Sequence, residues 1–391
     1  MNKKIKVLAI TGIRSEYDIL FPVLDTLNRD ENFELKIVVS GAHLSDWHGY
    51  TIEKIEKDGF EIADRIDNLL MTNRTTQRVK AIGMLTYALS QTVERVNPDI
   101  LLVVGDREES IATALVGNYM NVLVAHIGGG DTVYGNADDP IRFAVSKLAH
   151  IHFTTAQQYA DNLKNIGEEE FRIFNTGNPA LDNIRLTPKI SLEGISKTIN
   201  FSITDKNYIV LLKHPLSSEK EAAYSQMNTT LKAVEAFCNE TKFKVVAIYP
   251  NTDPGSYDIL KAINNYENKS FINYYKTLPR DIFVNVLRNA KALIGNSSMG
   301  ILEGPYYKLP VINVGRRQMG RLNAGNVEFV DYNQNEILSA LKKACYDEGY
   351  RNKVAALPNP FGDGKTAEII KDILLTIDLK DIKWYIKKKL C

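Results

Sequence analysis

Cysteine is scarce in this chain, with three residues in 391, at Cys238, Cys345 and Cys391. Their number is odd and they lie far apart, so they form neither a disulfide framework nor a cluster with metal-ligand spacing. The six histidines offer no pair with the spacing of a zinc site either. The sequence therefore predicts free thiols in a reducing compartment and no metal.

An excess of one charge is also lacking, because 48 Lys and Arg residues face 47 Asp and Glu residues. Proteins that bind nucleic acids or membrane surfaces usually carry a basic excess, so neither partner is expected. No apolar run approaches the roughly 18 residues of a membrane helix, and the N-terminal run Val7–Ile10 is too short for a signal peptide. Lys387–Lys389, beside Trp384, is interpreted as a solvated helix end. A cytoplasmic protein is predicted.

Two common nucleotide-binding motifs are missing as well. No Gly-x-Gly-x-x-Gly follows the first predicted strand, and the chain has no Gly-x-x-x-x-Gly-Lys-Ser/Thr loop. These absences disfavour dehydrogenases and kinase-like enzymes, and no cofactor is predicted.

The chain does contain a regular alternation of short apolar runs and longer helical patterns. The predicted strands are Ile5–Thr11, Leu35–Val39, Ile100–Val104, Val122–His126, Ile151–Thr154, Arg172–Asn175, Tyr208–Leu212, Lys244–Ile248, Ala292–Ile294 and Pro310–Asn313. The predicted helices include Tyr17–Leu27, Ser110–Tyr119, Ala156–Ile166, Glu219–Cys238, Ser256–Ile263 and Asp281–Asn289. Continuously apolar strands that alternate with helices indicate parallel sheets covered on both faces.

The length of the chain and one break in this alternation predict two domains. The Ser/Thr/Lys-rich segment Thr187–Lys206 contains Pro188 and little periodicity, which is typical of a linker. The predicted fold class is α/β, with two doubly wound, Rossmann-like sheets of similar size.

Chemically capable residues follow the strands of the first half, where open parallel sheets bind ligands. Gly12–Tyr17 contains Arg14, which suits a phosphate contact, although a plain turn explains this motif equally well. Asp106 follows a strand, and His126–Asp131 places three glycines before a carboxylate. Asp138 and Asp139 come next, and capping of the following helix accounts for one of them. Carboxylates gathered here can transfer protons, because burial and mutual repulsion raise their pKa values.

The second half carries groups that suit an anion. Gly295–Gly300 combines two glycines with Ser297 and Ser298 at the start of a helix, which either cradles a diphosphate or only caps the helix. Gly315–Arg321 holds three arginines on a loop after a strand, which favours anion binding. His214 ends the first strand of this half, and a structural role and a functional one are equally open for it.

Together these motifs resemble the hydrolysing UDP-N-acetylglucosamine 2-epimerases of sialic-acid-type sugar biosynthesis. The resemblance runs over nearly the whole chain as an ordered series of short matches. They are Gly12–Tyr17, Gly41–Leu44, Gly105–Arg107, His126–Asp131, Asp139–Arg142, Lys213–Pro215, Pro250–Asp253, Gly295–Ser298, Arg317–Arg321 and Gly362–Gly364. No single match is specific, but the ordered series is.

The resemblance implies two Rossmann-like domains that face a cleft, as in GT-B glycosyltransferases. It places them at residues 1–187 and 188–365, with helices in residues 366–391 that cross back to the first domain. It also implies a homodimer or homotetramer acting on a UDP-sugar. The implied reaction removes the proton at C2 and expels UDP from C1 by anti elimination. Water then adds to give the free 2-epimer, N-acetylmannosamine in the commonest case.

The resemblance further assigns roles to single residues. The implied catalytic residues are Asp106, Asp131, Asp139 and His214. The implied substrate-binding residues are Arg14, Glu16, His43, Arg142, Asn296, Ser297, Ser298, Glu303, Arg317, Gln318 and Arg321. Among them, Arg14 and the two serines would hold the diphosphate, and Glu303 the ribose hydroxyls.

Two positions depart from the family pattern. Gly128 stands where many relatives carry a side chain capable of acid–base chemistry, and Phe143 stands where they commonly carry histidine. These departures fit a different hexose, such as diacetylbacillosamine, or a protein that binds without catalysis. The ending Gly129–Asp131 favours the hydrolysing branch over a non-hydrolysing epimerase. A GT-B glycosyltransferase and a non-catalytic sugar-nucleotide sensor are also compatible with the motifs.

Overall fold

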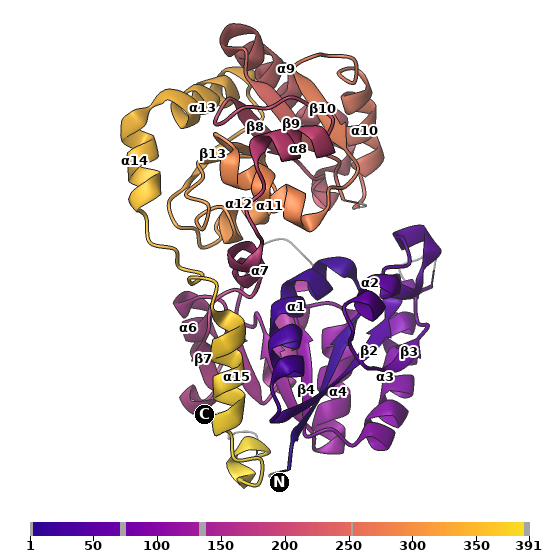
Figure 1. Cartoon of the computed structure of the whole chain (residues 1–391). Helices are drawn as coiled ribbons and strands as arrows, with labels where there is room; N and C mark the ends of the chain where they lie inside the picture. The colour runs from indigo at the N-terminus through magenta and orange to yellow at the C-terminus, as the bar shows by residue number, and fades with distance from the viewer. Residues whose placement is uncertain (1–2, 71–75, 133–137, 252, 387–391) are drawn as a thin grey trace. The chain divides into compact units, whose positions relative to one another are not determined.

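The structure is a computed structural model that describes residues 3–70, 76–132, 138–251 and 253–386, except the side chains of residues 138 and 139. The chain forms two compact units (Figure 1). Unit 1 comprises Met1–Arg185 and Phe361–Cys391, and unit 2 comprises Leu186–Pro360. The C-terminal segment therefore belongs to the same unit as the N-terminus.

Unit 1 is built on a parallel sheet of seven strands in the order β3-β2-β1-β4-β5-β6-β7. The strands are β1 (Ile5–Thr11), β2 (Phe33–Ser40), β3 (Ile62–Ile66), β4 (Ile100–Val104), β5 (Leu123–Ile127), β6 (Ile151–Thr154) and β7 (Ile173–Asn175). The α-helices are α1 (Arg14–Arg29), α2 (Ile52–Lys57), α3 (Thr76–Val96), α4 (Glu108–Met120), α5 (Asp138–Leu148), α6 (Gln157–Asn165), α7 (Ala180–Leu186) and α15 (Thr366–Thr376). Short 3-10 helices lie at Gly41–Leu44, Asp46–His48, Glu170–Arg172 and Ile382–Trp384.

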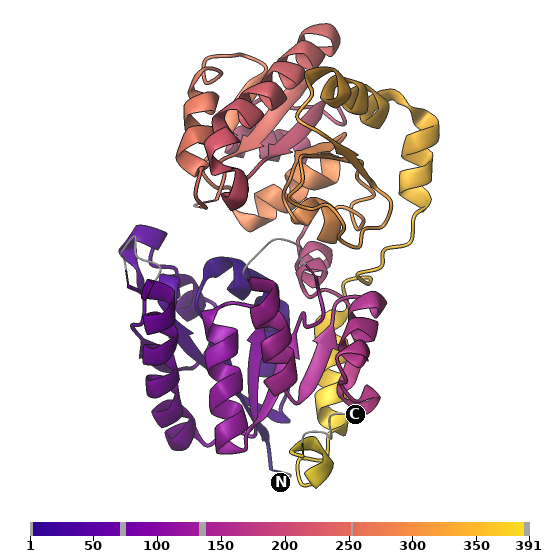
Figure 2. The ribbon, with the colours of Figure 1, turned by 180° about the vertical axis from the view of Figure 1, so that it is seen from behind.

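Both faces of this sheet are covered by helices. Successive residues of β1 point to opposite faces, so Val7 and Ala9 pack in one core with residues of α1 and α15. Leu8 and Ile10 pack in the other core, with residues of α3 and α4 (Figures 1 and 2). Because both faces are buried, the central strands are continuously apolar rather than alternating.

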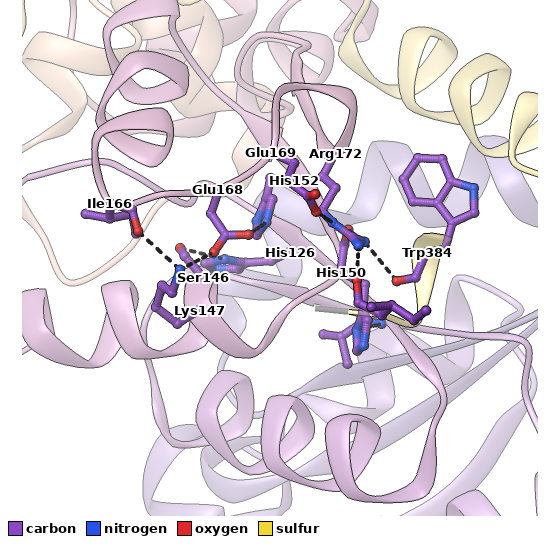
Figure 3. A network of polar contacts seen from close by, with 12 residues as sticks. His126, Ser146, Lys147, His150, His152, Ile166, Glu168, Glu169, Arg172 and Trp384 are labelled. Carbon is purple, nitrogen blue, oxygen red and sulfur yellow. Dashed lines mark hydrogen bonds and ion pairs between the residues drawn. The ribbon is translucent and has the colours of Figure 1, made fainter. Parts of the chain in front are cut away.

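The C-terminal segment is fastened to unit 1 by buried polar contacts. Asp182 of α7 accepts hydrogen bonds from the backbone N–H groups of Thr366 and Ala367, at 3.1 and 2.9 Å, where α15 begins. The fully buried guanidinium of Arg172 donates to the carbonyl oxygen of Trp384 at 2.8 Å, and to those of Lys383 and Ile386 (Figure 3). These contacts stabilise the return of the chain to unit 1.

Unit 2 has a parallel sheet of six strands in the order β10-β9-β8-β11-β12-β13. The strands are β8 (Tyr208–Leu212), β9 (Lys244–Ile248), β10 (Ile272–Tyr275), β11 (Leu293–Gly295), β12 (Val311–Val314) and β13 (Val327–Val330). The helices are α8 (Leu192–Thr198), η4 (Ser217–Ala222), α9 (Ala223–Thr241), α10 (Ser256–Asn264), α11 (Arg280–Asn289), α12 (Met299–Leu302), α13 (Gln334–Tyr346) and α14 (Glu348–Ala356). Residues of α9, α10 and α13 pack on one face of the sheet and those of α8 and α11 on the other (Figures 1 and 2).

The prediction of a linker at Thr187–Lys206 is wrong for most of that segment. It contains α8, and Ile195, Ile199 and Ile203 are buried in a core of unit 2. Three isoleucines spaced four residues apart are enough to anchor one face of the segment, although its other residues are polar.

Candidate active site

The predicted motifs gather where the strand order of each sheet reverses. In unit 1, β1 lies between β2 and β4, and in unit 2, β8 lies between β9 and β11. The loops after β1 and β4 carry Gly12–Tyr17 and Gly105–Arg107, and those after β8 and β11 carry Lys213–Pro215 and Gly295–Ser298. Ligands of open α/β sheets bind at such reversals, outside the carboxyl ends of the strands. Each unit therefore has one candidate binding edge.

In unit 1, Arg142 of α5 connects two of the predicted catalytic carboxylates. Its Nη2 donates to Oδ2 of Asp106 in the loop after β4. Its Nη1 donates to the carbonyl oxygen of Gly128 at 3.0 Å and lies 3.9 Å from Oδ2 of Asp131. All three side chains are largely buried, so their charges attract in a poorly hydrated environment. The side chain of Asp139, on the same helix, is outside the described residues.

His126 of β5 fixes the loop that carries Asp106. Its ring is fully buried, and Nε2 lies 2.7 Å from the carbonyl oxygen of Gly105. Because a carbonyl oxygen only accepts, Nε2 carries a proton and donates it there. This bond positions the Asp106 loop from the neighbouring strand.

A second charged group lies at the same edge, where the partly exposed Arg107 stands beside the buried Glu16 and Glu109. Burial is the main cause that raises the pKa of Glu16 and that of Glu109, and the charge of Glu109 raises the pKa of Glu16 further. Burial by itself would lower the pKa of Arg107, but the surrounding carboxylates outweigh it and raise that pKa. The edge therefore holds carboxyl groups that keep a proton more readily than usual, beside a permanently charged guanidinium.

His43 and Arg14 were both predicted to bind substrate, and their surroundings differ. His43 is fully buried, with Nε2 3.1 Å from Oγ1 of Thr11 and Nδ1 2.7 Å from Oγ1 of Thr51. Burial lowers the pKa of His43 to about 4, so its neutral ring ties the loops after β1 and β2 together. Arg14 is half-exposed, and its Nε lies 3.6 Å from Oδ2 of Asp18, which leaves it accessible to an anion.

The glycines before Asp131 are expected to tolerate substitution unequally. Gly128 and Gly130 both have φ of +80°, but a Cβ on Gly130 would lie 2.2 Å from the carbonyl oxygen of Tyr159, whereas one on Gly128 would meet no atom of the described residues within 4 Å. Gly128→Ala should lower the free energy of unfolding by about 1 kcal/mol, the cost of the left-handed backbone. Gly130→Ala should lower it by about 3 kcal/mol, because backbone must also move. Parallel urea denaturation tests this, and equal losses in the two variants would contradict it.

In unit 2, the loop after β11 is bound to the end of β8 through Asn296. Its Oδ1 accepts from the backbone N–H of His214 at 2.7 Å, and its Nδ2 donates to the carbonyl oxygen of His214 at 2.9 Å. Nδ1 of His214 accepts from the N–H of Asn251 at 3.0 Å, so the neutral ring carries its proton on Nε2. Burial, helped by the charges of Arg317 and Lys213, lowers the pKa of His214 to about 3. His214 is therefore a neutral hydrogen-bond donor at pH 7.

The loop after β12 brings the predicted arginines to the same edge. Nη1 of Arg317 and Nε2 of Gln318 donate to the carbonyl oxygen of Asn296, at 3.1 and 3.2 Å. Nη1 of Arg321 donates to Oε1 of Gln318 at 3.0 Å. Burial lowers the pKa of Arg317, as expected for a charge held away from water. Cationic groups in such a setting suit an anionic ligand.

At the Gly295–Gly300 turn, the hydroxyl groups of the two serines are better suited to contact an anion than the dipole of the helix that follows. Oγ of Ser297 accepts from the N–H of Met299 at 3.4 Å, and the side chain of Ser298 makes no capping bond. The following helix α12 has four residues, so its dipole is small. Glu303, which directly follows α12, has Oε2 3.7 Å from Nη2 of Arg280.

In the part of the chain that the structure describes, no group of three or more His, Cys, Asp or Glu side chains could hold a metal ion. Among the described helices, none combines the length and apolarity needed to cross a membrane.

Comparison with known proteins identifies the family. The family model for UDP-N-acetylglucosamine 2-epimerase matches residues 25–375. The chain belongs to this family.

Two relatives in the 2-epimerase family are similar over almost their full length. A UDP-N,N'-diacetylbacillosamine 2-epimerase (hydrolyzing) from Legionella pneumophila is 32% identical over 96% of both chains. A GDP/UDP-N,N'-diacetylbacillosamine 2-epimerase (hydrolyzing) from Campylobacter jejuni is 30% identical over 98% of both. The solved structure of UDP-GlcNAc 2-epimerase from Neisseria meningitidis bound to UDP-GlcNAc shares the fold, with a TM-score of 0.75 and 20% identity, over 95% of this chain and 100% of that one. The predicted fold class is confirmed.

For this member of the 2-epimerase family, the structure groups many of the predicted residues within each unit. It brings together Asp106, Asp131 and Arg142 in unit 1, and His214, Asn296, Arg317, Gln318 and Arg321 in unit 2. The sequence did not predict that His126 supports the Asp106 loop. It also did not single out Glu109 or Lys213 as residues of the candidate site. The position of Glu109 three residues after Asp106, in the first turn of the following helix, was the available signal for it.

Proposed function

We propose that the chain is a hydrolysing nucleotide-sugar 2-epimerase that converts a UDP-2-acetamido hexose, such as UDP-N-acetylglucosamine, to the free 2-epimer and UDP. A carboxylate takes the proton from C2, the C1–O bond to the diphosphate breaks, and UDP leaves with the electron pair. A C1=C2 double bond remains. Water then adds a hydroxyl group to C1 and a proton to the opposite face of C2, so each turnover consumes one water.

The observation that carries this proposal is the group formed by Asp106, Arg142 and Asp131. Inversion at C2 needs one group that removes a proton and another that returns one to the opposite face, and each such group is worth about 10²–10⁴-fold in rate. Two carboxylates fixed by one guanidinium supply a suitable pair. We assign Asp139 to the same step, and Glu16 to the support of this edge.

The groups of unit 2 suit the departing diphosphate. Negative charge develops on the diphosphate as the C1–O bond breaks. We assign its stabilisation to the Nε2–H group of His214, together with Arg317 and Arg321. Donors whose positions are fixed before the reaction stabilise such charge most. Four further predicted binding residues take the roles that the family resemblance implies for them. They are Arg14, Ser297 and Ser298 for the diphosphate, and Glu303 for the ribose.

UDP-N,N'-diacetylbacillosamine is a second candidate substrate. The relatives from Legionella and Campylobacter carry it in their names. Among the described residues, none has an atom within 4 Å of a Cβ placed on Gly128. Space at this position, next to the contact between Arg142 and Gly128, would accommodate a larger or less polar substituent on the hexose.

A substrate panel tests the proposal. The protein is incubated with UDP-N-acetylglucosamine, UDP-N,N'-diacetylbacillosamine and their GDP counterparts, and products are identified by ³¹P and ¹H NMR. Free 2-epimer together with UDP is expected. A 2-epimer still linked to UDP would indicate a non-hydrolysing epimerase, and release of UDP only with an acceptor would indicate a glycosyltransferase. Nucleotide binding without turnover of any sugar would indicate a sensor.

The double variant Ser298→Ala with Arg321→Ala should be defective mainly in binding. We expect UDP affinity to fall about 100-fold, because a hydroxyl donor and a charged donor to the diphosphate are lost. Titration calorimetry measures the affinity, and Arg316→Ala, at an exposed arginine of the same loop, is the control. An unchanged affinity in the double variant would contradict the placement of the diphosphate.

We also propose, from the family resemblance, that the protein is a cytoplasmic homodimer or homotetramer. Sedimentation velocity at micromolar concentration tests the assembly. A stable monomer would contradict it.

A further inference from the structure

Lys213 is a buried lysine at the carboxyl end of β8, and the proposed function gives it no role. It directly precedes His214, and 2% of its surface is exposed. Within the described part of the chain, its Nζ has no hydrogen-bond partner. An ammonium group is rarely buried in this way, because it loses its hydration without compensation.

The ionisable groups around Lys213 come from several elements of unit 2. Nζ lies 4.7 Å from the ring centre of Tyr332, which follows β13. The Tyr332 hydroxyl donates to Oε2 of Glu219 in η4 at 3.3 Å. Arg317, from the loop after β12, and His214, on the same strand end, are the other neighbours that interact electrostatically. One carboxylate, one guanidinium, one phenol and one neutral imidazole therefore surround the amine.

Lys213 is partly protonated and partly neutral near pH 7. Burial is the main cause that lowers its pKa, to about 7, while Glu219 opposes the shift and Arg317 adds to it. The imidazole of His214 is neutral and contributes no positive charge at pH 7. A diphosphate would bring at least two negative charges to this poorly hydrated edge, where they act on Lys213 as well as on Arg317.

We propose that Lys213 is a further cationic binding residue of the diphosphate site, an amine that takes up a proton when the nucleotide binds. The inference rests on the proposed function, because it needs a diphosphate at this edge of unit 2. The face of the Tyr332 ring then stabilises the ammonium group through a cation–π contact. Nucleotide binding and protonation are thereby linked, and the site gains positive charge only when its ligand is present.

At pH 8, binding of the nucleotide and protonation of Lys213 favour one another. Lys213 in the free protein is then about nine-tenths neutral, and UDP is fully ionised, since the second ionisation of a phosphate ester lies near pH 6. His214 stays neutral because its pKa is far below 8. A bound diphosphate that raises the pKa of Lys213 well above 8 leads to an uptake of most of one proton per nucleotide.

Calorimetric titration of UDP into the full-length protein, at pH 8.0 in Tris and in HEPES, measures this uptake from the difference in buffer ionisation enthalpy. We expect an uptake of most of one proton for the wild type and close to none for Lys213→Met, which should bind UDP about tenfold more weakly. Lys213→Arg keeps a charge that does not titrate, so it should bind UDP without proton uptake.

Lys206→Met is the matched control. Burial also lowers the pKa of Lys206, but its Nζ donates to the carbonyl oxygens of Arg288 and Ala290, and it lies before β8, at the other end of the strand. This variant should keep the wild-type uptake. Uptake that persists in Lys213→Met, or UDP binding to the wild type without uptake, would overturn the proposal. A wild type that binds no UDP would instead overturn the proposed function, and this inference with it.

Discussion

Asp106→Asn is expected to lower kcat by about 10³–10⁴-fold, the largest effect of any single change at the candidate site. The amide keeps the shape of the side chain but can neither take a proton nor pair with the guanidinium of Arg142. The variant should still bind UDP within about threefold of the wild type, because Asp106 is not among the groups proposed to hold the diphosphate. Steady-state kinetics and calorimetry with UDP measure the two effects separately.

Asp161→Asn provides the control for this variant. Asp161 is a carboxylate of α6 whose Oδ1 accepts a hydrogen bond from the side chain of Gln157, four residues earlier on the helix surface. Its replacement should change neither the rate nor the affinity. If Asp106→Asn turned over at the wild-type rate, Asp106 would be removed from the mechanism.

Glu168→Gln is expected to produce a large loss of stability, lowering the free energy of unfolding by about 3 kcal/mol. The carboxylate of Glu168 is 1% exposed, and its oxygens lie 2.9 Å from Nζ of Lys147 and 3.0 Å from Nε2 of His152 (Figure 3). Removal of the buried carboxylate charge takes away the ion-pair partner of Lys147 and weakens the hydrogen bond with His152, so the loss greatly exceeds that of a surface ion pair. Chemical denaturation of the purified variant measures the change.

Glu170→Gln is the matched control, two residues away. Glu170 is 81% exposed, and its Oε1 lies 2.6 Å from Nζ of Lys164. Exposed ion pairs contribute about 0–1 kcal/mol, so this variant should unfold almost as the wild type does. If both variants were equally stable, the contacts of the buried Glu168 would not contribute to the stability of the folded protein.

The sequence was sufficient to predict the central strands and one edge strand, β7, but not the other three edge strands. The three strands absent from the sequence-based prediction, β3, β10 and β13, all lie at an edge of their sheet. The residues of β13 are half-buried, and β3 contains Asp64 and Arg65. Such strands lack the continuous apolar run that marks a strand buried on both faces, and edge strands commonly carry charges.

The candidate site was predictable as a set of motifs but not as a network. Strand ends indicated Asp106, His214 and the arginine loop, because loops at the carboxyl edge can be located from the strands alone. The contact between Arg142 and Asp106 joins residues 36 positions apart, and no helical or strand period connects them. The burial of Lys213 was also hidden, since a lysine at the end of a strand normally reaches solvent.

The central claim is that proton transfer at C2 and release of UDP belong to one reaction. Turnover of the UDP-2-acetamido hexoses in deuterated water, followed by ¹H NMR and ³¹P NMR, tests it most directly. The account predicts free 2-epimer with one deuterium at C2 and one equivalent of UDP for each sugar formed. A sugar released with hydrogen retained at C2, or UDP released with the original configuration at C2, would contradict it.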